Sequence, residues 1–242
     1  MKVDKFRTVI IYIIIILLGL VCLLPLLNIV AISFSSSAAV EGNMVGLIPV
    51  GFSTAAYEKI LEDSQFWHSF LISVERVVLT LIINFVLIVL MAYPLSKTNA
   101  QFRGRNIYAN LMIFAMLFNG GMIPTFLLVK SYGLLNTVWA LVLPGAVPIF
   151  NVILVMNFFA AVPKELEEAA FIDGANPLQV LTKIFIPISK PVLATVSLFS
   201  IVGSWNDFYS GLIYMSKAAY YPLMTYIQSL QINVEDLIKQ GN

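Results

Sequence analysis

The chain has 242 residues, of which 60% are hydrophobic and 11% charged, and this composition is typical of polytopic membrane proteins rather than soluble domains. Its 14 basic and 13 acidic residues nearly balance, so the chain lacks the concentrated positive charge that a nucleic-acid partner requires. One cysteine and one histidine exclude an intrachain disulfide and a histidine-rich metal site.

Five apolar runs reach the length of about 20 residues that a helix needs to cross a bilayer, and they predict an all-α membrane fold. These runs cover about 9–32, 69–94, 106–129, 137–160 and 191–215. No small-residue cleavage site directly follows a short apolar region in the first run, which favours a retained anchor over a signal peptide. Glu75 and Arg76, near the start of the second run, are expected to form an end-of-helix pair or a contact with a partner protein outside the membrane.

The distribution of basic residues predicts the orientation, because Lys and Arg near helix ends are retained in the cytoplasm. One face collects nine of them: Lys2, Lys5, Arg7, Lys97, Arg103, Arg105, Lys164, Lys183 and Lys190. The opposite face collects four: Lys59, Lys130, Lys217 and Lys239. The amino terminus and the polar loop at 161–190 are therefore expected in the cytoplasm, and the carboxyl terminus outside. A short surface helix is expected at 55–62, and an interfacial or loop helix at 218–234.

The polar loop begins with a helix whose two ends are marked in the sequence. Pro163 suits a first helical position, and the glutamates that follow favour the positive end of the helix dipole. These glutamates are Glu165, Glu167 and Glu168. Gly174 is placed to end the helix with a left-handed cap.

A second short helix follows over about 178–185, restarting at Asn176 and Pro177 and ending at Pro187. It is expected to expose three apolar residues along one side: Leu181, Ile184 and Phe185. The loop is thus predicted to be a helix–turn–helix elbow that transmits a push from a soluble partner.

The spacing within this elbow resembles the EAA loop of bacterial ABC importer permeases. Glu168-Ala169-Ala170 is followed after three residues by Gly174, and after nine more by Ile184, with Ile186 and Pro187 beyond. Ile186 replaces the usual Leu, a conservative change in volume. The resemblance implies that the loop lies in a groove of an ATPase subunit. The coupling residues that it assigns are Glu168, Ala169, Ala170, Asp173, Gly174, Ile184 and Pro187. An ordinary amphipathic interfacial loop is the alternative.

Four further stretches resemble the carbohydrate branch of that family, the MalG-like and LplC-type permeases. They lie at 120–126, 134–137, 162–166 and 205–208. This resemblance implies a type I importer fold with an N-terminal transmembrane helix at 1–33 and a core at 67–242, in a multi-pass protein of the bacterial cytoplasmic membrane. The implied partners are a second permease in a heterodimer, two ATPase subunits that bind ATP and Mg, and an extracytoplasmic sugar-binding protein.

The family usually has six helices, so with five predicted spans the core is expected to be incomplete at its carboxyl end. A non-functional, truncated permease fragment therefore stays an open alternative.

Trp205, Asn206 and Asp207 are the candidate residues of a substrate pathway. Asp207 is the only charge deep in the fifth predicted span, where an ionisable group is costly unless it faces water, a partner or cargo. Carboxylates and amides bind sugar hydroxyls, and aromatic rings pack on sugar faces. The alternative is a polar clamp between helices or an interfacial aromatic belt. Four asparagines are expected to form interhelical hydrogen bonds rather than ligand contacts: Asn84, Asn119, Asn151 and Asn157.

No Gly-rich loop ending in Lys and Ser or Thr is present, so ATP is expected to bind another chain, and no cofactor or catalytic residue is predicted here. The function expected is a non-catalytic permease that imports an oligosaccharide. An ion-coupled secondary carrier is the main alternative. It would need intramembrane acids or discontinuous helices for its ion sites, and it usually has inverted repeats, which are not found in this sequence. A membrane-embedded enzyme is disfavoured by the absence of clustered His, Cys or Asp ligands.

Overall fold

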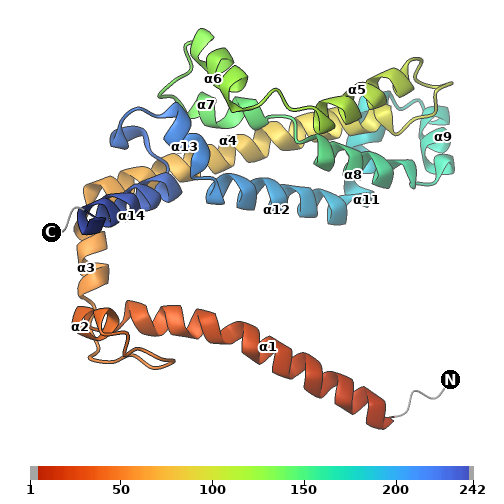
Figure 1. Cartoon of the computed structure of the whole chain (residues 1–242). Helices are drawn as coiled ribbons and strands as arrows, with labels where there is room; N and C mark the ends of the chain where they lie inside the picture. Colours follow the sequence, from red (N-terminus) through yellow and green to blue (C-terminus); the bar gives the residue numbers. More distant parts are fainter. Residues whose placement is uncertain (1–4, 240–242) are drawn as a thin grey trace. The chain divides into compact units, whose positions relative to one another are not determined.

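The computed structural model describes residues 5–239, with side chains described for residues 7–231, and separates the chain into two compact units, Met1–Ser64 and Gln65–Asn242. Regular secondary structure in the described residues is helical throughout, as the sequence predicts (Figure 1).

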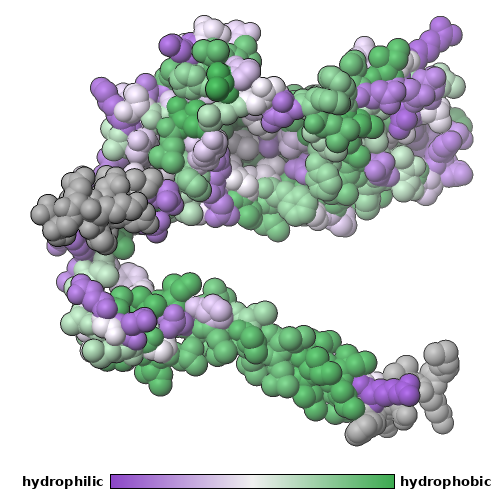
Figure 2. All heavy atoms as spheres, viewed as in Figure 1, coloured by the Kyte–Doolittle hydropathy of each residue, from purple (hydrophilic) through white to green (hydrophobic). Residues whose placement is uncertain are grey.

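The amino-terminal unit consists of one long helix and a short connection. Helix α1 spans Lys5–Ser33, and apolar side chains cover nearly its whole described surface (Figure 2). A helix that is hydrophobic all round suits a lipid environment, and α1 is long and apolar enough to cross a bilayer. Helices α2 (Ser37–Glu41) and α3 (Ala55–Glu62) follow, the latter where the sequence predicts it. The Asn28 carboxamide ties this connection to α1 by donating to the carbonyl of Gly46 at 2.6 Å.

The second unit is built along helix α4, Ser64–Leu95, whose 32 residues span about 48 Å. Within the described residues α1 and α4 are the two unbroken helices long enough to cross a membrane, and three bent helix pairs raise the number of candidate spans to five. The first pair, α5 (Arg105–Leu117) and α6 (Met122–Ser131), bends by 109°.

The second pair joins α7 (Val138–Val142) and a 3-10 turn (Leu143–Gly145) to α8 (Ile149–Ala160), with a bend of 47°. The third and fourth predicted spans, at about 106–129 and 137–160, correspond to these two pairs, and each is broken by a bend. Gly121 at the first break has φ +91°, a conformation that glycine adopts without strain, and Pro148 at the second break has no N–H to continue a helix.

The elbow follows α8 and leads into the last long helix. It contains α9 (Lys164–Ile172), α10 (Pro177–Val180), a π-helical turn (Leu181–Phe185) and α11 (Ile186–Ile188). Helix α12, Lys190–Asn206, then leaves the Pro177–Ile188 segment at 84°. The predicted fifth span ran on to residue 215, but the helix ends at Asn206 and a separate helix, α13 (Tyr209–Tyr214), follows.

Two hydrophobic clusters hold this unit together. The larger joins the end of α4 to α8, α12 and the elbow, through residues that include Ala92, Val155, Phe159, Val180 and Val196, all less than 3% exposed. The smaller joins α6, α7 and α13 through Val129, Ala140, Leu141, Tyr214 and Met215. The elbow thus contributes buried side chains to the main core.

The last described helix, α14 (Leu223–Lys239), follows a 3-10 turn (Ala218–Tyr220) and begins buried in the second unit. The backbone N–H of Leu223 donates to the Ser73 hydroxyl of α4 at 2.8 Å, and the Thr225 hydroxyl donates to the carbonyl of Phe208 at 2.8 Å. Gly211 of α13 lies so close to Thr225 that any β-carbon there would collide with it. The start of this predicted interfacial or loop helix is therefore a packed element.

Candidate functional site

The first helix of the elbow has a defined bend at its carboxyl end. Pro163 is the N-cap of α9, one position earlier than predicted, and Gly174 has φ +82° just after the helix end. The backbone N–H of Gly174 donates to the Phe171 carbonyl at 3.1 Å, and that of Ala175 donates to the Ala170 carbonyl at 2.9 Å. These two bonds form a Schellman motif, so the predicted left-handed glycine cap is confirmed.

The second half of the elbow is closed at its start by a reciprocal cap. The Asn176 side chain accepts from the Gln179 backbone at 2.9 Å, and the Gln179 side chain accepts from the Asn176 backbone at 2.9 Å. Pro187 does not end the helix as predicted, because a turn of π-helix precedes it and the helix continues to Ile188. A turn of π-helix leaves some carbonyl oxygens without their usual N–H donor. Pro187, which has no N–H, therefore fits after this turn.

The apolar side of this second half is buried against the core, whereas the prediction had it exposed. Leu181 and Phe185 are 4% and 3% exposed and belong to the main core, while Ile184 is half-buried against it. The predicted exposure of these side chains is therefore wrong, since helical periodicity identifies an apolar face but not what covers it.

A buried ion pair joins α9 to the end of α4. Lys97 Nζ donates to Glu167 Oε2 at 2.7 Å, and the two side chains are 12% and 10% exposed. The Tyr93 hydroxyl donates to the other carboxylate oxygen at 3.3 Å. Lys97 Nζ also lies 4.1 Å from the centre of the Tyr93 ring and 4.2 Å from that of Phe185. Burial lowers the pKa of Lys97 below its ordinary value, and the hydrogen bond and charge of Glu167 oppose this shift.

The residues that the sequence assigns to coupling lie mostly on the outside of the elbow. Five of them are exposed: Glu168, Ala169, Asp173, Gly174 and Pro187. The other two, Ala170 and Ile184, are half-buried. A hollow of about 410 Å³ lies between the two halves of the elbow, lined among others by Ala170, Asp173, Gly174 and Ile184. The motif thus presents the Asp173 carboxylate and small residues around a concave surface.

Three exposed apolar residues on the same elbow were not among the predicted site residues. Ile172 is 86% exposed, Leu178 63% and Phe171 43%. They lie at the turn between α9 and α10, next to Asp173 and Gly174. Their positions in a polar loop were the available signal, because a group of large exposed apolar side chains usually marks an interaction site.

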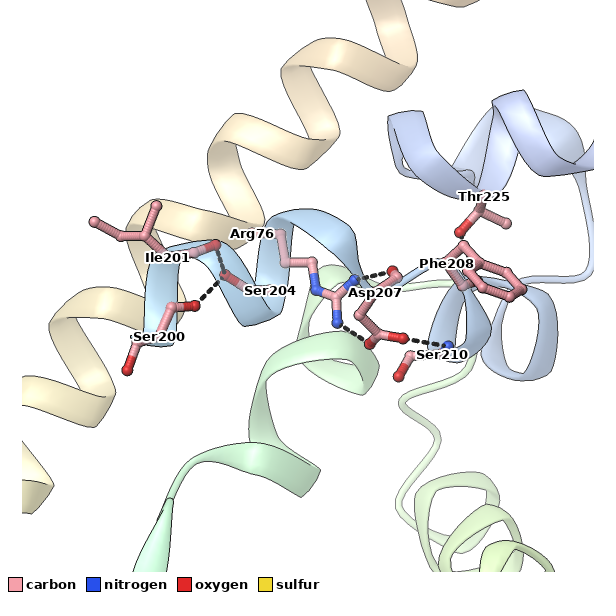
Figure 3. Close-up of polar contacts among 8 residues, drawn as sticks. All are labelled: Arg76, Ser200, Ile201, Ser204, Asp207, Phe208, Ser210 and Thr225. Carbon is pink, nitrogen blue, oxygen red and sulfur yellow. Dashed lines mark hydrogen bonds and ion pairs between the residues drawn. The ribbon is translucent and has the colours of Figure 1, made fainter. Parts of the chain in front are cut away.

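Asp207, at the other end of α12, is held by an arginine of α4 (Figure 3). Arg76 Nη2 contacts Asp207 Oδ2 at 2.5 Å, and Nη1 donates to the Asp207 carbonyl at 2.9 Å. Asp207 Oδ1 accepts from the Ser210 backbone at 3.1 Å. Arg76 is 4% exposed whereas Glu75 is exposed, so the predicted end-of-helix pair between these neighbours is wrong.

The three candidate pathway residues do not line a common cavity. Trp205 packs edge-to-face on Phe70 of α4 with ring centres 5.9 Å apart. The exposed Asn206 donates to the carbonyl of Val202 in its own helix at 3.0 Å. Only Asp207 lines the polar cavity described next.

A cavity of about 280 Å³ lies between α4, α7, α8 and α12. Its polar lining includes Arg76, Thr80, Asn84, Asn151 and Ser200. Asn84 Nδ2 donates to the Ser200 hydroxyl at 3.2 Å, which confirms the predicted interhelical bond for this asparagine. The described residues contain no group of three or more His, Cys, Asp or Glu that could hold a metal ion.

Comparisons with known proteins agree with this architecture. A family model described as "Binding-protein-dependent transport system inner membrane component" matches residues 77–237. Protein LplC of Bacillus subtilis is 42% identical over 214 residues, covering 88% of this chain and 72% of that protein. The polygalacturonan/rhamnogalacturonan transport system permease protein YtcP of Bacillus subtilis is 40% identical over 229 residues, covering 95% of this chain and 79% of that protein.

A solved structure shares the fold over nearly the whole chain. It is that of a bacterial ABC transporter involved in the import of the acidic polysaccharide alginate, with a TM-score of 0.85 and 34% identity. The match covers 95% of this chain and 81% of that chain. The resemblance and the importer fold predicted from the sequence are thereby confirmed. The chain belongs to the family of binding-protein-dependent transport system inner membrane components, the non-catalytic membrane permeases of ABC importers.

Proposed function

We propose that this chain is the permease subunit of an importer that moves an oligosaccharide, and that its elbow couples closure of an ATPase to alternating access. The observation that carries the proposal is the elbow itself, in which the exposed Glu168 and Ala169 and the half-buried Ala170 stand on a helix anchored to the core by the Lys97–Glu167 ion pair.

The construction of the elbow favours transmission of force. Both halves are capped by hydrogen bonds, and the second half buries Val180 and Phe185 in the main core. A displacement of α9 is therefore transmitted to α4 through Lys97 and to α12 through the core. A loop that only lay on a membrane surface would need none of these attachments.

The proposed coupling surface consists of the outward-facing residues of the motif. Glu168 and Asp173 meet basic groups of the ATPase, Ala169 and Ala170 permit close approach, and Gly174 makes the bend. Ile184 and Pro187 complete the surface from the second half. The exposed Phe171, Ile172 and Leu178 add an apolar area that a partner would cover.

The same proposal assigns an orientation, a division of the chain and a set of partners. The amino terminus and the elbow lie in the cytoplasm of a bacterium, residues 1–33 form a membrane anchor, and 67–242 form the transport core. The partners are a second permease in a heterodimer, two ATPase subunits that bind ATP and Mg, and an extracytoplasmic sugar-binding protein. The positive-inside asymmetry and the family assignment support these statements.

The names of the relatives support a saccharide cargo. YtcP is described as transporting polygalacturonan and rhamnogalacturonan, and the matched structure belongs to an alginate importer. We retain Trp205, Asn206 and Asp207 as candidate residues of the sugar route. If Asp207→Asn and Trp205→Ala both leave uptake by the full complex at the wild-type level, these residues are structural.

The coupling proposal is tested by charge reversal on α9. Glu168→Lys is expected to weaken association with the ATPase at least tenfold in a pull-down from membranes, because like charges brought together at an interface cost several kcal/mol. Glu165→Lys is the matched control, since this residue is also exposed on α9 but lies outside the motif. Unchanged association for Glu168→Lys, or equal losses for both variants, would contradict the assignment.

A further inference from the structure

Helix α4 carries three buried polar residues on one face, each with an unused hydrogen-bonding atom. Arg76, Thr80 and Asn84 are spaced four residues apart, so their side chains follow one another along the helix. They are 4%, 8% and 4% exposed. Arg76 Nε, Thr80 Oγ1 and Asn84 Oδ1 have no hydrogen-bond partner among the described residues.

These three unused atoms belong to residues that line the same cavity of about 280 Å³. Ser200 and Ser204 of α12 also line this cavity, and Figure 3 shows them together with the Arg76–Asp207 pair. Buried polar atoms are nearly always hydrogen-bonded, and in a membrane protein such groups usually mark a cavity or pathway. Three unused atoms gathered in one hollow therefore point to a ligand that supplies the missing partners.

The chemistry of the lining selects the class of ligand. Arg76 Nε is a donor, Asn84 Oδ1 an acceptor, and the Thr80 hydroxyl is both. The arginine charge is already compensated by Asp207, so the cavity offers little net attraction to a carboxylate. A hydroxyl group donates and accepts, which matches this mixed and electrically balanced lining. The volume lies just below the range of about 300–1,000 Å³ for ligand pockets, and fits a part of a saccharide rather than a whole chain.

We propose that this cavity binds the hydroxyl groups of one sugar ring of the cargo, through Arg76, Thr80 and Asn84 of α4. The inference rests on the proposed sugar-import function and deepens it, because it assigns direct cargo contact to this subunit and places it on α4. Trp205 and Asn206 do not line this cavity.

Thr80→Val is the decisive variant, because it keeps the side-chain shape and removes a hydroxyl that has no partner in the described chain. The assembled importer, reconstituted with its partners, is assayed for uptake of labelled oligogalacturonides and of neutral arabino-oligosaccharides. For the transported probe, we expect the KM to rise roughly three- to tenfold with ATPase association unchanged. Thr80→Ser restores the hydroxyl and is expected to return the KM to the wild-type value.

Ser189→Ala is the matched control, since the Ser189 hydroxyl is also buried and without a partner in the described chain but does not line this cavity. It is expected to leave the KM unchanged, and the melting temperature of Thr80→Val is expected to equal or exceed that of the wild type. A wild-type KM for Thr80→Val, an equal effect of Ser189→Ala, or loss of the second permease from the Thr80→Val complex would overturn the inference. If the wild-type complex takes up neither probe, the proposed function fails together with this inference.

Discussion

The buried Lys97–Glu167 pair gives the sharpest prediction about how the elbow is held. Lys97→Met keeps much of the side-chain volume but removes the charge that compensates Glu167. The carboxylate then retains the Tyr93 hydroxyl, at 3.3 Å, as its remaining partner among the contacts described above. We therefore expect α9 to separate from α4 far more often than in the wild type.

The size of the effect follows from burial. Removing one partner of a buried ion pair costs about 3–5 kcal/mol, and the lower end applies here because each side chain keeps about a tenth of its surface exposed. About 3 kcal/mol corresponds to a change of roughly a hundredfold in the opening equilibrium. Glu167→Gln keeps an oxygen that accepts from Lys97, and the ammonium stays over the Tyr93 and Phe185 rings, so this variant is expected to cost less, about 1–3 kcal/mol. The double variant Lys97→Met with Glu167→Leu buries no unpaired charge and is expected to recover about 2 kcal/mol.

Amide hydrogen exchange of α9 in the assembled complex measures this local opening directly. Exchange within Lys164–Ile172 is expected to accelerate on the order of a hundredfold in Lys97→Met and less than tenfold in the double variant. Lys164→Met, at the exposed start of α9, serves as the control and is expected to change little. Wild-type exchange in Lys97→Met, or a double variant that exchanges as fast as the single one, would refute the anchoring role of the pair.

Three further substitutions test the local structure. Gly174→Ala places a β-carbon at φ +82° and is expected to destabilise the elbow by about 1 kcal/mol and to reduce coupled uptake, which transport assays measure. Asn176→Ala removes half of the reciprocal cap, so we expect about 1 kcal/mol lower stability in thermal unfolding. Gly211→Ala is expected to cost about 1–3 kcal/mol of stability because its β-carbon would collide with Thr225. Gly203→Ala, with open space around the new β-carbon, is the control and is expected to be neutral or stabilising. Equal melting temperatures for the two variants would show that the contact between Gly211 and Thr225 is not tight.

The elbow was predictable where its structure depends on near neighbours in sequence. The glycine cap at Gly174 and the restart at Asn176 and Pro177 follow from backbone chemistry within a few residues, and both are confirmed. The direction of its apolar side was not predictable, because periodicity does not tell whether lipid, a partner or the chain's own core covers Leu181 and Phe185.

The membrane segments were predictable in number but not in shape. Apolar composition identifies a run that tolerates lipid, whereas a break depends on local backbone geometry at positions such as Gly121 and Pro148. These residues were visible in the sequence, but glycine and proline also occur inside continuous membrane helices.

The two ion pairs described above were beyond sequence reasoning because their partners are far apart along the chain. Arg76 and Asp207 are separated by 131 residues, and Lys97 and Glu167 by 70. Arg76 was predicted to pair with its neighbour Glu75, and Glu167 was predicted only to interact with the helix dipole. Hydropathy and local pattern contain no information about which charges meet after the helices pack.

Site-specific cross-linking from the elbow tests the central claim most directly. Cys22 is the only native cysteine, so a Cys22→Ser chain carrying Ala169→Cys places one thiol on the exposed face of the motif. The account predicts that a thiol-reactive cross-linker joins Ala169→Cys to an ATP-binding subunit in native membranes, with a yield that changes when ATP is added. It predicts no such product from Thr195→Cys, an exposed position on α12. No adduct with an ATP-binding subunit from Ala169→Cys, or equal yields from both positions, would contradict the account.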